Sequence, residues 1–322
     1  MDDKQTAILA AQVQNWPEAR RHSRNLALLE EPPLIDIEAA SACNITCSFC
    51  PRSEMSRPAR LMSEQTFAQV LALLPDNATV MFSGLGDSLL NPRLEQFVAA
   101  LTERRISPCL ITNGIRLTPE RQQSLADAGL AQIQISVHGL DPGTLAPIVT
   151  RGANPARVLA NLEHLAAWRP ATLRVRLNLV ETPDNAHARP AVRELADRLG
   201  FGFFYRRLHT RGGTVDSSRN SSSCSGCGIF GAVTFITVEG DVLPCVNDVR
   251  GEGRLGHVRD LSWPTLRERK RDVISQGAWF SACEHCNDDY RWVILAQGGV
   301  DEPESEGHIR RTPGRVITNP SG

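Results

Sequence analysis

Three cysteines within eight residues constrain this chain more than any other feature. Cys43, Cys47 and Cys50 have the spacing C-x3-C-x2-C and follow a short alternating apolar run at 34–38 that predicts a strand. Thiolates so placed can face one point, and soft sulfur ligands select iron–sulfur or zinc sites. Three ligands leave one corner of a four-iron cluster open to a group that is not protein. A structural zinc site would need a fourth Cys or His close by, and none follows Cys50 within a few residues. Three simply buried thiols are the other alternative.

The composition excludes some classes of partner. The chain has 322 residues and a formal net charge of −1, so it lacks the basic surface of a nucleic-acid-binding protein. It has no run of eighteen apolar residues and no secretory pattern at its start, so we expect no membrane segment. Nine cysteines without an export signal favour metal ligation over disulfides, and we expect the protein in the cytoplasm.

Strand-like and helical runs alternate from residue 34 to about 207. The predicted strands are 34–38, 78–82, 109–112, 132–137, 173–180 and 202–207. The predicted helices are 63–74, 93–104, 118–128, 155–167 and 187–199. Ser63 and Thr118 are suitable N-caps for two of them. Such alternation predicts an α/β fold with a parallel sheet, and in such sheets ligands bind at the carboxyl ends of the strands.

The first cysteine group, placed after a first predicted strand, resembles the signature of the radical SAM enzymes. In that family the open iron binds the amino and carboxylate groups of S-adenosylmethionine. The resemblance implies a SAM-binding 4Fe-4S cluster on Cys43, Cys47 and Cys50, and a partial (β/α)6 TIM-like barrel. It also implies a flavodoxin or ferredoxin-type electron donor and cleavage of S-adenosylmethionine to a 5′-deoxyadenosyl radical.

Residues at the predicted strand ends are those that the resemblance places around S-adenosylmethionine. The segment Gly84-Leu85-Gly86-Asp87 stands where the family usually has Gly-Gly-Glu, and its acid would accept from the methionyl amine. The expected cosubstrate-binding residues are Gly84, Gly86, Asp87, Asn113, Ser136, His138, Arg176 and Asn178. Plainer explanations of the same residues are a turn, a helix cap, a buried hydroxyl, a structural or substrate-facing histidine and a solvated strand face.

A cationic segment follows the last predicted strand of the barrel. Arg207, His209 and Arg211 alternate as in an extended segment leaving the barrel, and we expect them to bind an anionic or polyhydroxylated substrate. Ion pairs with neighbouring acids are the alternative. The serine-rich stretch 216–223 then predicts a linker.

The second cysteine group is spread over the last third of the chain. It comprises Cys224, Cys227, Cys245, Cys283 and Cys286. Alternating apolar residues around 239–241 predict a two-stranded hairpin with a tight turn just before the third of these cysteines. Four such thiolates could complete the coordination of a cubane cluster or hold tetrahedral zinc.

Together with the first motif, this group resembles the auxiliary-cluster region of the SPASM/twitch branch of radical SAM enzymes. No cysteine follows Cys286, so the resemblance favours the shorter twitch form with one auxiliary 4Fe-4S cluster, the form of aminocyclitol-oxidising enzymes. It implies Cys227, Cys245, Cys283 and Cys286 as ligands. Cys224 is left over, as an alternative ligand, a hydrogen-atom donor, or neither.

We therefore expect four regions: a helical arm at 1–33, the barrel at 34–213, an auxiliary-cluster domain with a hairpin and helix at 214–296, and a tail at 297–322. The expected activity is oxidation of a small sugar-like or aminocyclitol-like metabolite. The alternatives are a radical epimerase, a maturase of a ribosomally made peptide, and a non-catalytic iron–sulfur or zinc protein. The arm is too short for the leader-binding module of many peptide maturases, and an electron carrier needs no glycine-rich cosubstrate loop.

Overall fold

Parallel strands form the centre of the computed structural model, which describes residues 18–217, 227, 230–277 and 279–288. Through these residues runs a nine-stranded sheet in the order β11-β10-β9-β1-β3-β4-β5-β7-β8. Its barrel strands are β1 (Leu34–Ile37), β3 (Thr79–Phe82), β4 (Ser107–Thr112), β5 (Gln132–Ser136), β7 (Arg174–Glu181) and β8 (Gly202–Arg207). Neighbouring barrel strands all pair in parallel, which confirms the predicted α/β partial barrel.

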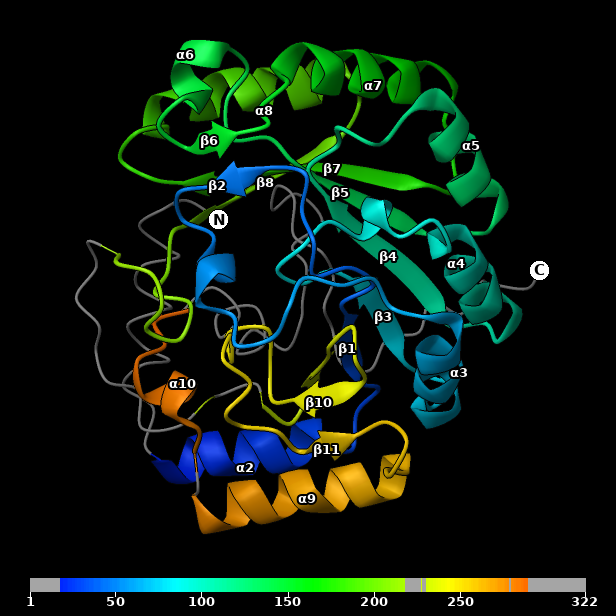
Figure 1. Cartoon of the computed structure of the whole chain (residues 1–322), viewed down its shortest axis with the longest axis vertical. Helices are drawn as coiled ribbons and strands as arrows, with labels where there is room; N and C mark the ends of the chain where they lie inside the picture. The colour runs from blue at the N-terminus through cyan, green and yellow to red at the C-terminus, as the bar shows by residue number, and fades with distance from the viewer. Residues whose placement is uncertain (1–17, 218–226, 228–229, 278, 289–322) are drawn as a thin grey trace.

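Helices cover the outside of the curved sheet (Figure 1). The five predicted ones are α3 (Glu64–Leu73), α4 (Leu94–Glu103), α5 (Pro119–Asp127), α7 (Pro155–Trp168) and α8 (Arg189–Arg198). Shorter turns are η1 (Pro51–Glu54), η2 (Ser88–Leu90), α6 (Pro142–Leu145) and η3 (Ala186–Ala188). Ser63 and Thr118 accept backbone N–H groups at the starts of α3 and α5, as predicted. In the described part of the chain no helix is long and apolar enough to cross a membrane.

The two faces of the barrel sheet differ in chemistry. Side chains alternate along a strand, so Ile35, Val80 and Leu177 point to the helices and join the main apolar core. On the opposite face the buried side chains include Gln134 and Asn178. A barrel interior that buries such polar side chains among apolar ones has capacity to hold a ligand with polar groups.

The C-terminal hairpin extends the barrel sheet. Strand β9 (Val233–Ile236) pairs in parallel with β1, and β10 (Asp241–Leu243) folds back on β9 with the predicted antiparallel pairing. The short β11 (Gly256–His257) forms the sheet edge. The predicted hairpin is thus confirmed, and it is continuous with the barrel through β1.

Two long helices lie side by side next to this hairpin (Figure 1). They are α2 (Glu18–Leu28), from the predicted N-terminal arm, and α9 (Trp263–Gln276), which precedes the short α10 (Ser281–Glu284). An ion pair of 3.0 Å joins Arg271 of α9 to Glu30 just after α2. The described part of the arm therefore packs on the C-terminal region of the same chain.

Candidate functional site

Two adjoining cavities of about 220 and 280 Å³ lie where the barrel strands end. They share Ile45, Asn113, Ser136 and His138. Further residues of the smaller cavity, which we call the barrel cavity, include Cys43, Cys47, Cys50, Gly84, Gly86, Asp87, Gln134, Asn178, Arg206 and Arg211. Most of the residues predicted to bind iron or S-adenosylmethionine are thus brought to one place.

The loop carrying the first three cysteines is held by backbone contacts. Strand β2 (Thr46–Cys47) pairs antiparallel with β6 (Val149–Arg151), which follows β5. The guanidinium of Arg52 donates to the backbone oxygens of Ile45 at 3.2 Å and Cys43 at 3.5 Å. The loop is therefore closed on itself and tied to the barrel, with its thiols on the cavity side.

The surroundings of these thiols suit an iron–sulfur cluster. Burial raises the pKa of the Cys47 thiol to about 12, with further contributions from Cys50 and Cys43. Burial also raises the pKa of Cys43. Three half-buried thiolates so close together need a cationic partner, and iron supplies one. Among the described residues no three acidic, His or Cys side chains meet closely enough to chelate a single metal ion; the ligands of a cubane sit on separate irons.

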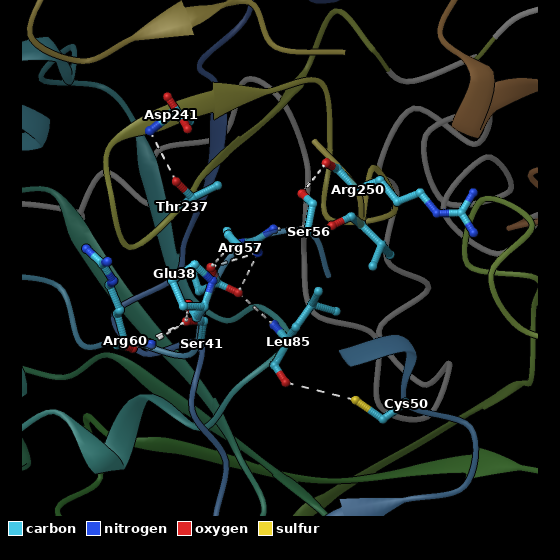
Figure 2. A network of polar contacts seen from close by, with 12 residues as sticks. Glu38, Ser41, Cys50, Ser56, Arg57, Arg60, Leu85, Thr237, Asp241 and Arg250 are labelled. Atoms are coloured by element: carbon cyan, nitrogen blue, oxygen red, sulfur yellow. Dashed lines mark hydrogen bonds and ion pairs between the residues drawn. The ribbon is translucent and has the colours of Figure 1, made fainter. Parts of the chain in front are cut away.

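The glycine-rich loop lies directly against the start of the cysteine loop. A side chain at Gly86 would collide with the backbone oxygens of Ala40 and Ala42, so only glycine permits this approach. The N–H of Asp87 donates to the oxygen of Ala42 at 2.9 Å. Leu85 presents its backbone oxygen 3.9 Å from the sulfur of Cys50 (Figure 2). The two loops therefore form one rigid wall of the cavity.

Asp87 is fully engaged by protein donors. Its carboxylate accepts from the Thr112 hydroxyl at 2.8 Å, from the N–H of Asn113 at 2.9 Å and from the N–H of Leu89 at 3.0 Å. Burial raises the pKa of Asp87, and these three donors lower it. The acid joins the ends of β3 and β4, and its contact with a methionyl amine stays a prediction.

Asn113 bridges the end of β4 to the cysteine loop. Its side-chain N–H group donates to the Asn44 side-chain oxygen at 2.8 Å and lies 3.8 Å from the sulfur of Cys43. Its own oxygen accepts from the N–H of Ile115, which closes a turn in the loop after β4. The cavity-lining role considered for this residue is confirmed, whereas the helix-cap role is wrong, because α5 begins at Pro119 and has Thr118 as its N-cap.

His138 is a neutral histidine in the cavity wall. Its Nδ1 accepts from the backbone N–H of Val180 at 3.2 Å, and its ring meets Phe49 edge-on. Burial, then Arg206 and Arg211, lower the pKa of His138 to about 4. The ring is therefore uncharged near pH 7, and because Nδ1 is an acceptor its proton is on Nε2.

Two buried amides in this cavity have unused hydrogen-bonding capacity. The side-chain oxygens of Gln134 and Asn178 have no hydrogen-bond partner among the described residues, although both side chains are only 4% exposed. Gln134 was not predicted, but counting alternate residues back from Ser136 along β5 would have found it. Buried amides without partners are unfavourable, so a bound polar molecule is expected to complete them.

The predicted cationic segment is divided by the fold. Arg211 lines the cavity. Arg206, the residue before Arg207 on β8, also lines it and was not predicted. His209 is buried 3.6 Å from Asp288 and is not among the lining residues. Arg176 is not among them either. The side chain of Arg207 and all of Cys224 lie outside the described residues.

The four cysteines predicted as auxiliary ligands line a second cavity of about 30 Å³, together with Asp248 and Asp288. Burial raises the pKa of Cys286 well above its usual value, and Asp288, Cys245 and Cys227 add to the rise. Asn247 donates towards the sulfur of Cys286 at 3.8 Å. Three segments far apart in the chain thus supply four thiols to one cavity. This donor set suits a cubane, whose irons take one thiol each, whereas no three of the described thiols meet closely enough to chelate a single zinc ion.

A buried ion pair that was not predicted links the two cysteine regions (Figure 2). Glu38, at the end of β1, binds Arg57 at 2.8 Å and also accepts the N–H of Leu85 at 3.1 Å. Arg57 donates in turn to the backbone oxygen of Val249 at 3.3 Å, in the segment after β10. The glycine-rich loop, the segment after the first cysteines and the C-terminal region therefore meet at one buried charge pair.

Comparison with known proteins agrees with this arrangement. The S-adenosyl-L-methionine-dependent 2-deoxy-scyllo-inosamine dehydrogenase of Niallia circulans is 24% identical over 270 residues, covering 79% of this chain and 92% of that protein. The PqqA peptide cyclase of Rhodopseudomonas palustris is 32% identical over 169 residues, covering 51% of this chain and 44% of the cyclase. This chain therefore spans less than half of the cyclase's length.

Two solved structures share the fold. BtrN in complex with AdoMet and 2-DOIA has a TM-score of 0.55 and 20% identity, covering 80% of this chain and 93% of that chain. Streptococcus suis SuiB bound to the precursor peptide SuiA has a TM-score of 0.61 and 15% identity, covering 84% and 73%.

The family model described as the radical SAM superfamily matches residues 37–169, the part that holds the first three cysteines and the glycine-rich loop. Residues 37–169 therefore match the radical SAM superfamily in sequence, and they carry the three-cysteine motif on a partial barrel of this topology.

Proposed function

We propose that this enzyme oxidises a small polar metabolite, of the sugar or aminocyclitol type, by radical dehydrogenation. Cys43, Cys47 and Cys50 would hold the cluster that binds S-adenosylmethionine, and Cys227, Cys245, Cys283 and Cys286 an auxiliary 4Fe-4S cluster. The observation that carries the proposal is that each cysteine group lines its own cavity in one fold, the first beside buried polar side chains of the barrel interior and the second enclosed. The match to the inosamine dehydrogenase along most of both chains supports it.

The reduced cluster that Cys43, Cys47 and Cys50 would hold would supply the electron for cleavage of S-adenosylmethionine, and the resulting 5′-deoxyadenosyl radical would take a hydrogen atom from a substrate carbon. The protein's contribution is to position the cosubstrate and the substrate. The wall formed by the cysteine and glycine-rich loops is fixed by Asp87 and Asn113, and the two adjoining cavities offer room for a cosubstrate and a small substrate.

Binding of the proposed substrate depends on the polar side chains buried in the barrel interior. Gln134 and Asn178 offer hydrogen bonds to hydroxyl groups, and the neutral His138 offers a donor at Nε2. Conversion of a hydroxyl carbon to a ketone then removes one hydrogen atom, one proton and one electron. Cys227, Cys245, Cys283 and Cys286 would hold an auxiliary cluster that would supply an acceptor for that electron, and a flavodoxin or ferredoxin-type protein is the expected donor to the first cluster.

Peptide modification is the second candidate. The 32% identity to a PqqA peptide cyclase and the shared fold with SuiB bound to its precursor peptide favour it. The epimerase alternative requires a hydrogen-atom donor such as Cys224, which lies outside the described residues.

Anaerobic reconstitution followed by incubation with dithionite and S-adenosylmethionine tests the proposal. We expect about eight irons per chain and formation of 5′-deoxyadenosine. A panel of aminocyclitols deuterated at the carbinol carbon should transfer deuterium to 5′-deoxyadenosine and yield a ketone. A content of about four irons together with bound zinc would contradict the proposed auxiliary cluster and indicate a structural zinc site instead. Solvent deuterium at the product carbon would indicate epimerisation, and turnover of peptides alone would favour the second candidate.

A further inference from the structure

A lysine is buried behind the wall of the second cysteine cavity. Lys270, on α9, is 1% exposed, and its ammonium donates to the backbone oxygens of Phe230 at 2.9 Å and Val233 at 2.6 Å. The ammonium also lies 5.0 Å from the centroid of the Phe230 ring. All of these partners are neutral, and none of the described carboxylates forms an ion pair with it.

The choice of lysine here is unusual for this chain. Of its 35 lysines and arginines, only Lys4 and Lys270 are lysines. Two carbonyls and a ring can surround a compact ammonium, whereas a planar guanidinium with five donors would leave several of them unpaired. The site therefore selects a small point charge.

A countercharge for this cation is available in the neighbouring cavity, across the residues that hold the ammonium. Buried charges are rarely found without a countercharge. Phe230 and Val233, which hold the ammonium, also line the cavity of about 30 Å³ formed by the four cysteines. Burial lowers the pKa of Lys270 to about 7, and the thiolates of Cys227 and Cys245 act in the opposite direction.

We propose that Lys270 is the built-in countercharge of the auxiliary cluster and raises its reduction potential. Reduction by one electron adds negative charge to the cluster, and a fixed cation in a dry environment stabilises that reduced form more than the oxidised one. A higher potential makes the cluster a better acceptor for the electron released by a substrate radical. This inference rests on the auxiliary cluster of the proposed function.

The test isolates the auxiliary cluster. In a background where Cys43, Cys47 and Cys50 are all changed to Ala, only the second cluster remains, and its potential is measured by anaerobic redox titration followed by electron paramagnetic resonance. Lys270→Met should reduce the equilibrium constant for one-electron reduction at least tenfold, equivalent to a potential lower by about 59 mV. Lys270→Gln, which keeps hydrogen-bond donors but no charge, should shift it in the same direction.

Arg271→Met is the matched control, because it removes a cation from the adjacent position whose side chain is 45% exposed and paired with Glu30. We expect its potential to equal that of the background protein, since water screens that charge. An unchanged potential in both Lys270 variants, with about four irons still bound, would overturn the inference. Absence of iron from the background protein with Lys270 intact would instead overturn the auxiliary cluster of the proposed function.

Discussion

The two cysteine groups are built in opposite ways. The first comes from one loop of eight residues, supplies three thiols and lines a cavity of about 220 Å³ with both polar and apolar walls. The second comes from three distant segments, supplies four thiols and encloses only about 30 Å³. A single loop can approach a cluster from one side only and leaves its other side open to a cosubstrate. Ligands from three segments surround a cluster, which suits electron transfer better than substrate binding.

The two groups are also joined physically. The Glu38–Arg57 pair is almost fully buried and contacts both the glycine-rich loop and the segment after β10 (Figure 2). Strand β1 pairs with β3 of the barrel on one edge and with β9 of the C-terminal hairpin on the other. A change in one region is therefore expected to affect the other.

Loss of one thiol from the first group should have the largest effect. Cys47→Ser is expected to abolish 5′-deoxyadenosine formation and lower the iron content by about four per chain, because the open-cornered cluster cannot form. Chromatographic detection of 5′-deoxyadenosine and an iron assay measure both. Cys109→Ala is the matched control, since Cys109 is buried in β4 and is not among the residues lining either cysteine cavity. Persistent cleavage in the Cys47 variant would contradict the assignment of this group.

Loss of a thiol from the second group should separate cleavage from oxidation. Cys245→Ala is expected to lower iron by about four per chain while leaving 5′-deoxyadenosine formation detectable, because the first cluster remains. Ketone formation should be lost, since the electron acceptor is gone. Ketone formed by this variant at the unaltered rate would show that the second group has no part in the oxidation.

Removing the Glu38–Arg57 ion pair that connects the two regions should lower the free energy of unfolding. Arg57→Met leaves the Glu38 carboxylate buried without its cation, which typically costs about 3–5 kcal/mol. Arg60→Met removes a pair whose arginine is 62% exposed, and a cost under about 1 kcal/mol is expected. Anaerobic urea unfolding of the reconstituted proteins measures both. Equal stabilities would mean that the buried pair does not hold the regions together.

The smallest effect concerns pH. Because the pKa of His138 is lowered to about 4 in the folded protein, the unfolded chain binds the proton first as the pH falls below about 6.5. Stability is therefore fully present above that pH and is lost on acidification towards pH 4. Between pH 7.5 and 5.5 we expect a loss of roughly 1 kcal/mol that is absent in His138→Gln, measured by urea unfolding with iron content checked at both pH values. The same pH dependence in the variant would assign the loss to other groups.

Most of the fold could be predicted because its signals are local. Apolar alternation, helical periodicity and the caps at Ser63 and Thr118 lie within single elements, and the parallel strands were found within a few residues of their ends. The cysteine spacings are equally local, and the seven predicted ligands lie at two cavities. Their roles as ligands remain predictions.

What could not be predicted depends on contacts between distant segments. The pairing of β9 with β1, the Glu38–Arg57 link and the position of Lys270 behind the second cavity join parts of the chain with no shared pattern. The presence of Arg206 in the barrel cavity depends on which face of β8 turns inward. Periodicity tells which residues share a face, but burial and charge compensation are set only when separate faces meet in space.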